Sequence, residues 1–242
     1  MHALREPELL AVWEEVYRAN PPARALALLS AADPEAIPST LAALSIGERD
    51  ARLLELRTLM FGQRISGSID CPGCREPIEL DFEVSDIRTA SPQPTSLHLD
   101  MDGYGVHFRL PTSMDLARLR PAQRIEEARA MLLGSCVERA EYRGDAVAVE
   151  ELPAHLAHAV AERMAENDPQ ADVLLVTTCP SCERQWNQTF DIAHYFWEEI
   201  QAWALKMLRD VHELATAYSW NETEILSISP WRRRLYLEMA GR

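Results

Sequence analysis

The sequence predicts an α+β fold in which helices at both ends of the chain flank a central β module. Apolar residues recur at helical spacing near both ends of the 242 residues, and strictly alternating segments lie between them. Two Cys-Pro-x-Cys knuckles each separate two alternating segments. A knuckle between two strands is half of a zinc ribbon. We therefore expect a zinc-ribbon-like antiparallel module, built from two distant hairpins and carrying an inserted hairpin-plus-helices segment.

The two knuckles are Cys71-Pro72-Gly73-Cys74 and Cys179-Pro180-Ser181-Cys182. Each tight turn directs two sulfurs to one point, and two such pairs complete a tetrahedral cage that suits Zn²⁺, with Zn–S distances of about 2.3 Å. A compact ribbon module has roughly 15–20 residues between its knuckles, whereas 104 residues lie between Cys74 and Cys179. A structural zinc ion held by Cys71, Cys74, Cys179 and Cys182 would join two distant parts of the chain.

Two other roles for these cysteines are less favoured. A redox Cys-x-x-Cys pair normally lies at the start of a helix, and neither knuckle is followed by a helical pattern. A disulfide within one knuckle would close a small strained loop, and no secretion signal indicates an oxidising compartment. Four unrelated core cysteines would not be expected to share this spacing. Structural zinc is the interpretation that the matched pattern favours.

The composition limits the class of partner. The chain is 47% apolar, which is enough for one or two cored domains, and its net charge is −14. Phosphate binding needs clustered Lys and Arg, so nucleic acid is not expected as the main partner, nor is an anionic membrane. The sequence has no run of about 18 apolar residues, so we expect no transmembrane helix. The first residues lack an apolar signal core, and we expect the protein in a reducing cytoplasm.

Helical periodicity, capping residues and prolines predict the helices. They are expected at about 7–18, 23–32, 45–61, 113–119, 121–139, 152–166 and 191–218, followed by two short helices capped by Asn221 and Ser229. The clearest boundary is the capping-box pattern from Ser45 to Glu48, with Gly62 just past the end of the same helix.

Alternation of apolar and polar residues predicts most of the strands, and a continuous apolar run predicts the one at 171–177. They flank the first knuckle at 65–69 and 78–84, and the second at 171–177 and 185–191. Segments 97–101 and 106–110 flank Asp102-Gly103, which is a strong signal for a hairpin. A weaker strand pair is expected at 141–142 and 147–149.

These elements divide the chain into three expected parts. They are an N-terminal helical segment (1–62), a zinc-ribbon-like core (63–191) that contains the inserted hairpin and helices (92–170), and a C-terminal helical tail (192–242).

The sequence contains no recognisable arrangement of catalytic residues. Its nine glycines form no phosphate-binding loop, and there is no H-E-x-x-H motif. His155 and His158 lie three apart on a helix without a further ligand, and His98 and His107 are expected to face each other as a solvated pair. Cys136 falls on the apolar face of its helix and is expected to be a small core residue. Because four cysteines would close the zinc shell, a non-enzymatic protein is expected.

The order of these features resembles a known family. The segments "FRLPTSMDL" (108–116) and "YSWNETEILSISPWRRRLYLEM" (218–239), together with the paired knuckles, are similar to the T-even-type baseplate hub assembly proteins of contractile phage tails and contractile injection systems. The resemblance covers most of the chain. It implies a factor that helps to assemble the baseplate hub, either leaving afterwards as a chaperone would or staying in the tail particle.

Partner contacts are expected on the C-terminal helices. The candidate residues for binding a tail or hub protein are Trp197, Trp203, Trp220, Trp231, Leu235 and Met239. For the aromatic residues at 195–203, packing in the core is the interpretation that helical spacing favours, and an exposed partner patch is the alternative. The run Arg232–Arg234 is more consistent with a helix end than with a nucleic-acid site in so acidic a chain. Two other classes remain open: a zinc-ribbon module that binds nucleic acid, and an enzyme on an unfamiliar scaffold.

Overall fold

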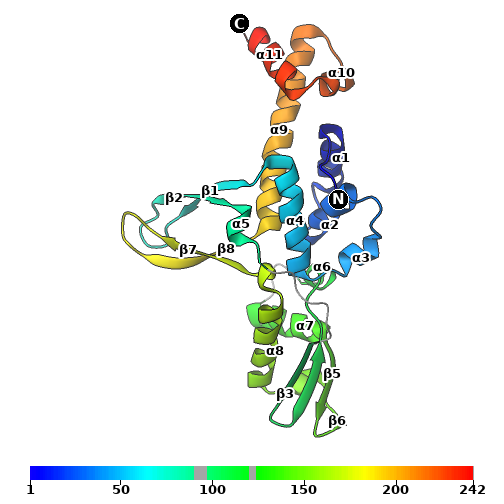
Figure 1. Cartoon of the computed structure of the whole chain (residues 1–242), viewed down its shortest axis with the longest axis vertical. Helices are drawn as coiled ribbons and strands as arrows, with labels where there is room; N and C mark the ends of the chain where they lie inside the picture. Colours follow the sequence, from blue (N-terminus) through cyan, green and yellow to red (C-terminus); the bar gives the residue numbers. More distant parts are fainter. Residues whose placement is uncertain (90–96, 120–123, 242) are drawn as a thin grey trace.

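The computed structural model describes residues 1–89, 97–119 and 124–241. The loop expected at 91–95 and the helix start expected at Pro121 lie outside the described residues. Figure 1 shows a helical body at mid-height, two β hairpins projecting to its left, an inserted unit below it and the C-terminal helices above it. The mixed α and β content agrees with the expected class, and every strand pairing is antiparallel within the described residues.

The helical body combines both ends of the chain. It consists of α1 (Glu6–Val16), α2 (Pro21–Ala32), α3 (Pro38–Ala42), α4 (Ile46–Phe61) and the first half of α9 (Ile192–Tyr218). Side chains of Asn20, Ser45 and Asp191 accept a backbone N–H at the starts of α2, α4 and α9, which is the usual role of these residue types before a helix. Leu53 of α4 and Phe196 of α9 are fully buried in the shared core. The α9 segment is therefore part of the main core in its first half.

Two hairpins extend from this body. The first pairs β1 (Arg64–Asp70) with β2 (Pro77–Glu83), and the second pairs β7 (Val173–Thr178) with β8 (Gln185–Phe190). The expected strands are present with two differences. Val84 begins the short helix α5 (Val84–Ile87), and the strand expected from residue 171 begins at Val173. Each hairpin is a separate two-stranded sheet, so the expected central β module is not one continuous sheet. In Figure 1 both hairpins lie beside the helical body and not between its helices.

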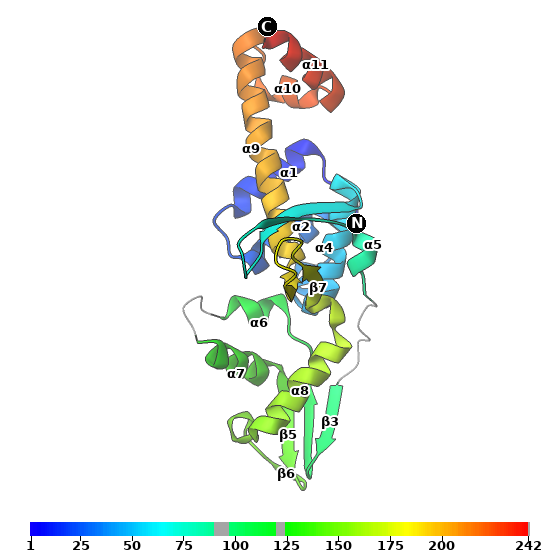
Figure 2. The same cartoon turned by 90° about the vertical axis from the view of Figure 1, so that its left-hand side faces the viewer.

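The inserted unit has its own core. Its sheet has the strand order β3 (Leu97–Met101), β4 (Tyr104–Phe108), β5 (Val137–Tyr142) and β6 (Asp145–Ala146), and its helical segments are α6 (Ser113–Ala117), α7 (Ile125–Cys136), η1 (Val149–Glu151) and α8 (Ala154–Asn167). Figure 2 shows α8 lying across this sheet. Phe108, Cys136 and Leu156 have 0% exposure in this core. The turn expected at Asp102-Gly103 is present, and both residues have positive φ angles (54° and 82°).

Several boundaries in the insert differ from the expectation; for example, the strand expected at 106–110 covers Tyr104–Phe108. The helix expected to reach residue 139 ends at Cys136, because Val137 and Arg139 pair with Phe108 and His107 of β4. The last strand covers Asp145–Ala146 and not 147–149. Pairing with a distant strand therefore overrides the local helical pattern.

The C-terminal elements form a small unit above the body. The second half of α9 packs against α10 (Glu222–Ser227) and α11 (Pro230–Ala240). Leu214 and Ile225 are fully buried there. Asn221 forms the expected capping box with Glu224, and Ser229 caps α11.

A polar junction connects the insert to the helical body. Asp168, which is 3% exposed, accepts hydrogen bonds from the N–H of Gly47 (2.9 Å) and the hydroxyl of Ser45 (3.2 Å) at the start of α4. Next to it, in η2 (Pro169–Ala171), Gln170 accepts from the N–H of Thr89 (2.9 Å). After the insert, the chain thus contacts the start of α4 directly. Asp168 and Gly47, which form this contact, are 121 residues apart in the sequence.

Two glycines test this junction. A Cβ atom on Gly47 would lie 2.0 Å from the Asp168 carboxylate, whereas one on Gly134 in α7 would meet nothing within 4 Å. Alanine favours a helix over glycine by up to about 1 kcal/mol, and overpacking costs about 1–3 kcal/mol. We expect Gly134→Ala to raise the free energy of unfolding and Gly47→Ala to lower it by at least about 1 kcal/mol, measured by urea denaturation. Equal stabilisation by both substitutions would contradict the close contact with Asp168.

Candidate metal centre

The two knuckles have the same backbone structure. The N–H of Arg75 donates to the carbonyl of Cys71, and the N–H of Glu183 donates to that of Cys179, both at 2.9 Å. Each first cysteine also donates its own N–H to the carbonyl five residues later, again at 2.9 Å in both knuckles. Arg75 (φ 61°) and Glu183 (φ 58°) occupy the left-handed region that each turn requires. The similarity of the two sequences therefore reflects two equivalent turns.

Aromatic contacts hold the hairpins together near the helical body. Phe82 of β2 and Phe190 of β8 meet edge to face, with ring centroids 5.4 Å apart. Tyr195 of α9 packs on Phe190 (5.4 Å), and its hydroxyl donates to the carbonyl of Ser66 in β1 at 2.8 Å. These contacts set the angle at which the two hairpins leave the body, and the angle brings their tips together.

The four knuckle sulfurs lie together at the tips. The Sγ atoms of Cys71 and Cys182 are 3.6 Å apart, as are those of Cys74 and Cys179, and all four lie within 4.8 Å of one another. Sulfurs bound about 2.3 Å from a tetrahedral zinc ion are about 3.8 Å apart, whereas a disulfide bond is about 2.05 Å long. All four are free thiols. The spacing matches a four-sulfur metal cage and not a pair of disulfides.

Burial differs between the two cysteines of each knuckle. Cys71 and Cys179 are buried (1% and 0% exposed), while Cys74 and Cys182 are exposed. Close packing across the tips is also evident at Gly73, where an added Cβ would lie 3.1 Å from the Arg184 side chain. A glycine in the first knuckle therefore allows the second to approach it.

The electrostatics of the cluster disfavour simultaneous ionisation of all four thiols. Backbone N–H groups of Cys74 and Gly73 lower the pKa of Cys71 to about 6. At Cys74 the backbone of Glu76 lowers the pKa, but the Cys179 thiol and the loss of solvent raise it by more, to about 12. Adjacent thiolates repel one another, and a bound dication offsets that repulsion because metal-bound cysteines are deprotonated. Four thiolates would fill a tetrahedral shell and leave no position for a substrate, which is typical of structural sites.

The other histidine and cysteine candidates lie elsewhere. His98 and His107 are cross-strand neighbours with ring centroids 4.2 Å apart, as expected. His155 contacts Asp102 (3.0 Å), so it and His158 do not share a ligand set. Cys136 is fully buried, and burial raises its pKa to about 11, which agrees with a core role.

The six candidate partner residues fall into three groups. Trp197 is 2% exposed, and the guanidinium carbon of Arg24 lies 4.4 Å from the centroid of its ring. Trp197 therefore belongs to the core, which corrects its inclusion among the candidate partner residues. It lies on the face of α9 that packs on α2. Trp203 and Trp220 are half-buried. Trp231, Leu235 and Met239 are exposed on α11 (70%, 38% and 52%).

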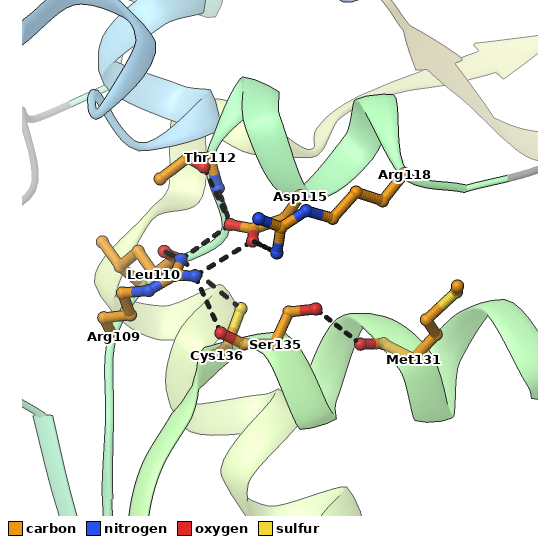
Figure 3. Close-up of polar contacts among 8 residues, drawn as sticks. All are labelled: Arg109, Leu110, Thr112, Asp115, Arg118, Met131, Ser135 and Cys136. Carbon is orange, nitrogen blue, oxygen red and sulfur yellow. Dashed lines mark hydrogen bonds and ion pairs between the residues drawn. The ribbon is translucent and has the colours of Figure 1, made fainter. Parts of the chain in front are cut away.

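Sequence reasoning missed an ion pair inside the "FRLPTSMDL" segment. Arg109 donates two hydrogen bonds to Asp115 (2.6 and 2.9 Å) and a third to the carbonyl of Ser135 (2.7 Å), as Figure 3 shows. Thr112 donates to the same carboxylate through its N–H (2.9 Å) and hydroxyl (2.8 Å). The Thr-x-x-Asp spacing indicated a helix start, but the arginine six residues away gave no signal of its own.

This ion pair fixes the link between the insert and the body. The segment between Arg109 and Asp115 contains Pro111, whose carbonyl accepts the N–H of Ile46 at 3.0 Å, and Thr112, which forms a β-bridge with Ser45. The bonds from Arg109 and Thr112 therefore hold a turn that contacts the start of α4. Residues 109–115 therefore attach the insert to the helical body.

The fold and cluster define a protein of mixed helices and small antiparallel sheets, in which two distant hairpins bring four cysteines together. A family model described as T4 bacteriophage base plate protein matches residues 28–197, which include both knuckles and the Arg109–Asp115 segment. The chain belongs to this T4 bacteriophage base plate protein family, and the expected resemblance to baseplate proteins is confirmed. Searches of curated proteins and of solved structures found no match. In the described part of the chain, no helix has the length and apolar content that crossing a membrane requires.

Zinc content tests the cysteine cluster. We expect close to one zinc ion per purified chain by elemental analysis, and almost none in the Cys74→Ser/Cys182→Ser variant, whose two substituted residues are exposed. Because metal binding couples to folding, this variant should also show faster hydrogen exchange in both hairpins. Cys136→Ala is the control, since it removes a thiol from a different core and should retain the metal. Metal-free protein whose hairpins exchange as slowly as those of metal-loaded protein would contradict a structural zinc.

The Arg109–Asp115 pair predicts a pH dependence. Burial alone would raise the pKa of Asp115, but hydrogen bonds from Arg109 and Thr112 lower it to about 2. An unfolded Asp has a pKa of about 3.9, so the carboxylate stabilises the fold above pH ~4, and this contribution disappears as the pH falls through ~2. Asp115→Asn should therefore lower the free energy of unfolding by about 2 kcal/mol at pH 7 and by much less near pH 2. A difference that stays constant across this range, in denaturant titrations, would contradict the assignment.

Proposed function

We propose that this protein is a non-enzymatic assembly factor or structural component of the baseplate hub in a contractile phage tail or injection system. The single observation that carries the proposal is the family match over residues 28–197. Membership of a baseplate family supports a structural or assembly role and implies contacts with other baseplate or tail proteins. The protein would act in the cytoplasm of the producing cell, and it would either leave as a chaperone or remain in the particle.

A structural zinc ion supports this role physically. The ion would be held by Cys71, Cys74, Cys179 and Cys182, whose sulfurs lie within 4.8 Å of one another. It would unite the two hairpins as a zinc-ribbon-like unit and so set the entry and exit of the insert. An assembly protein needs surfaces that keep a fixed relative position, and a metal cross-link between distant segments supplies that.

The charges near the hairpins disfavour the nucleic-acid alternative. Strand β2 carries Glu79, Asp81 and Glu83, and Arg64 of β1 is already paired with Asp81. Binding to phosphates needs unpaired Lys and Arg in excess. Proteins of the baseplate are therefore the partners that we expect.

Assembly can be tested in the producing cell. When a tagged full-length chain is expressed with its tail genes, we expect it to co-purify with a baseplate protein, and we expect a strain that lacks it to yield incomplete baseplates by electron microscopy. Mass spectrometry of finished particles separates a resident component from a chaperone that leaves. Normal baseplates in the deletion strain, together with no co-purified tail protein, would overturn the proposal.

A further inference from the structure

Helix α11 is anchored to the protein by one face. At about 100° per residue, Arg233, Tyr236, Leu237 and Ala240 fall on one side of the helix. Arg233 is 3% exposed and pairs with Glu6 of α1 at 2.6 Å. Tyr236 packs against Tyr218 and Trp220, with ring centroids 5.6 and 4.9 Å away. These contacts hold α11 in place before any partner binds.

The opposite face carries a row of large apolar side chains. Trp231, Leu235 and Met239 recur every four residues and are 70%, 38% and 52% exposed. The row is centred about 200° from the anchored face and is about 12 Å long. Because the other face of α11 is anchored, the helix cannot rotate to bury this row against the protein. Tryptophan and methionine are enriched in the buried cores of protein interfaces.

Basic side chains lie on both sides of this row. On the helical wheel, Arg232 falls on one flank and Arg234 on the other. Both are exposed, and neither makes an ion pair within the described residues. Helix α11 carries three arginines and one glutamate, in a chain whose net charge is −14. Arg233 is paired with Glu6, and Glu238 falls on the same flank as Arg234, so the outer face keeps one net positive charge. Its local charge is thus opposite in sign to that of the molecule.

We propose that the outer face of α11 inserts into an apolar groove of a protein partner whose rim carries aspartates or glutamates. A convex row of apolar side chains fits a groove, and the rim carboxylates would pair with Arg232 and Arg234. Because α11 is already anchored, binding would not require the helix to become ordered. This inference rests on the proposed function, which makes the partner a baseplate or tail protein.

Binding measurements with the full-length chain test the inference. The probes are the purified baseplate and tail proteins of the same phage or injection system, each tested by calorimetry at low and high salt. We expect one of them to bind, and Trp231→Ala/Met239→Ala to weaken that binding by at least roughly tenfold. Arg232→Glu/Arg234→Glu should weaken it mainly at low salt, and replacing rim carboxylates of the partner by lysine should restore it.

Two matched controls separate specific from general effects. Ile125→Ala removes an equally exposed apolar side chain (71%) from α7 in the insert, and Arg18→Glu/Arg129→Glu makes the same change in net charge at two other exposed sites. Both controls should bind like the wild type, and all variants should keep its circular dichroism and melting temperature.

Each other outcome overturns a distinct claim. If one baseplate protein binds the α11 variants and the controls with equal affinity, the inference fails while the proposed function stands. If the wild type binds none of the baseplate or tail proteins, both fail. Self-association, or binding to anionic vesicles or DNA, that is lost only in the α11 variants would overturn the assigned partner class.

Discussion

The convergence of four sulfurs at the hairpin tips is the constraint around which the two hairpins are arranged. An isolated two-stranded hairpin is at best marginally stable in water, and each of the two hairpins is a separate sheet. Packing of Phe82 on Phe190 joins them only near the body. A metal ion bound by Cys71, Cys74, Cys179 and Cys182 would join them at the other end as well. Because the hairpins are where the chain leaves and re-enters the body, such a cross-link would also orient the insert.

The polar contacts below the hairpins serve the same purpose by different chemistry. Asp168 binds the start of α4, and Arg109 and Asp115 hold the turn that contacts it. Buried charges are costly unless each is hydrogen-bonded, and Asp115 accepts bonds from both Arg109 and Thr112. Their geometry is therefore specific, and the insert has a defined attachment although its core is separate from that of the body.

Local patterns predicted most of the elements and the candidate metal centre. The Ser45 cap, the Asp102-Gly103 turn and the alternation at 78–83 correspond to elements in the structure because each depends on residues within one turn or strand. The cysteine spacing predicted the cluster because two matched knuckles form two matched turns. The helix end at Cys136 was missed, and Trp197, named among the candidate partner residues, is buried. Each depends on a segment far away in the chain, namely β4 in the first case and α2 in the second.

Patterns among neighbouring residues were enough to predict the helices, the hairpins and the two knuckles. The composition alone gave the net charge of −14. Long-range packing accounts for the rest. It places the insert on α4, pairs Arg109 with Asp115, and turns Trp197 inward while leaving Trp231 exposed. The physical reason is that a tryptophan is buried only where another element packs on it, and that element can lie far away in the sequence. Arg24 of α2 lies over Trp197, and α11 itself is held by the Arg233–Glu6 contact, which spans 227 residues.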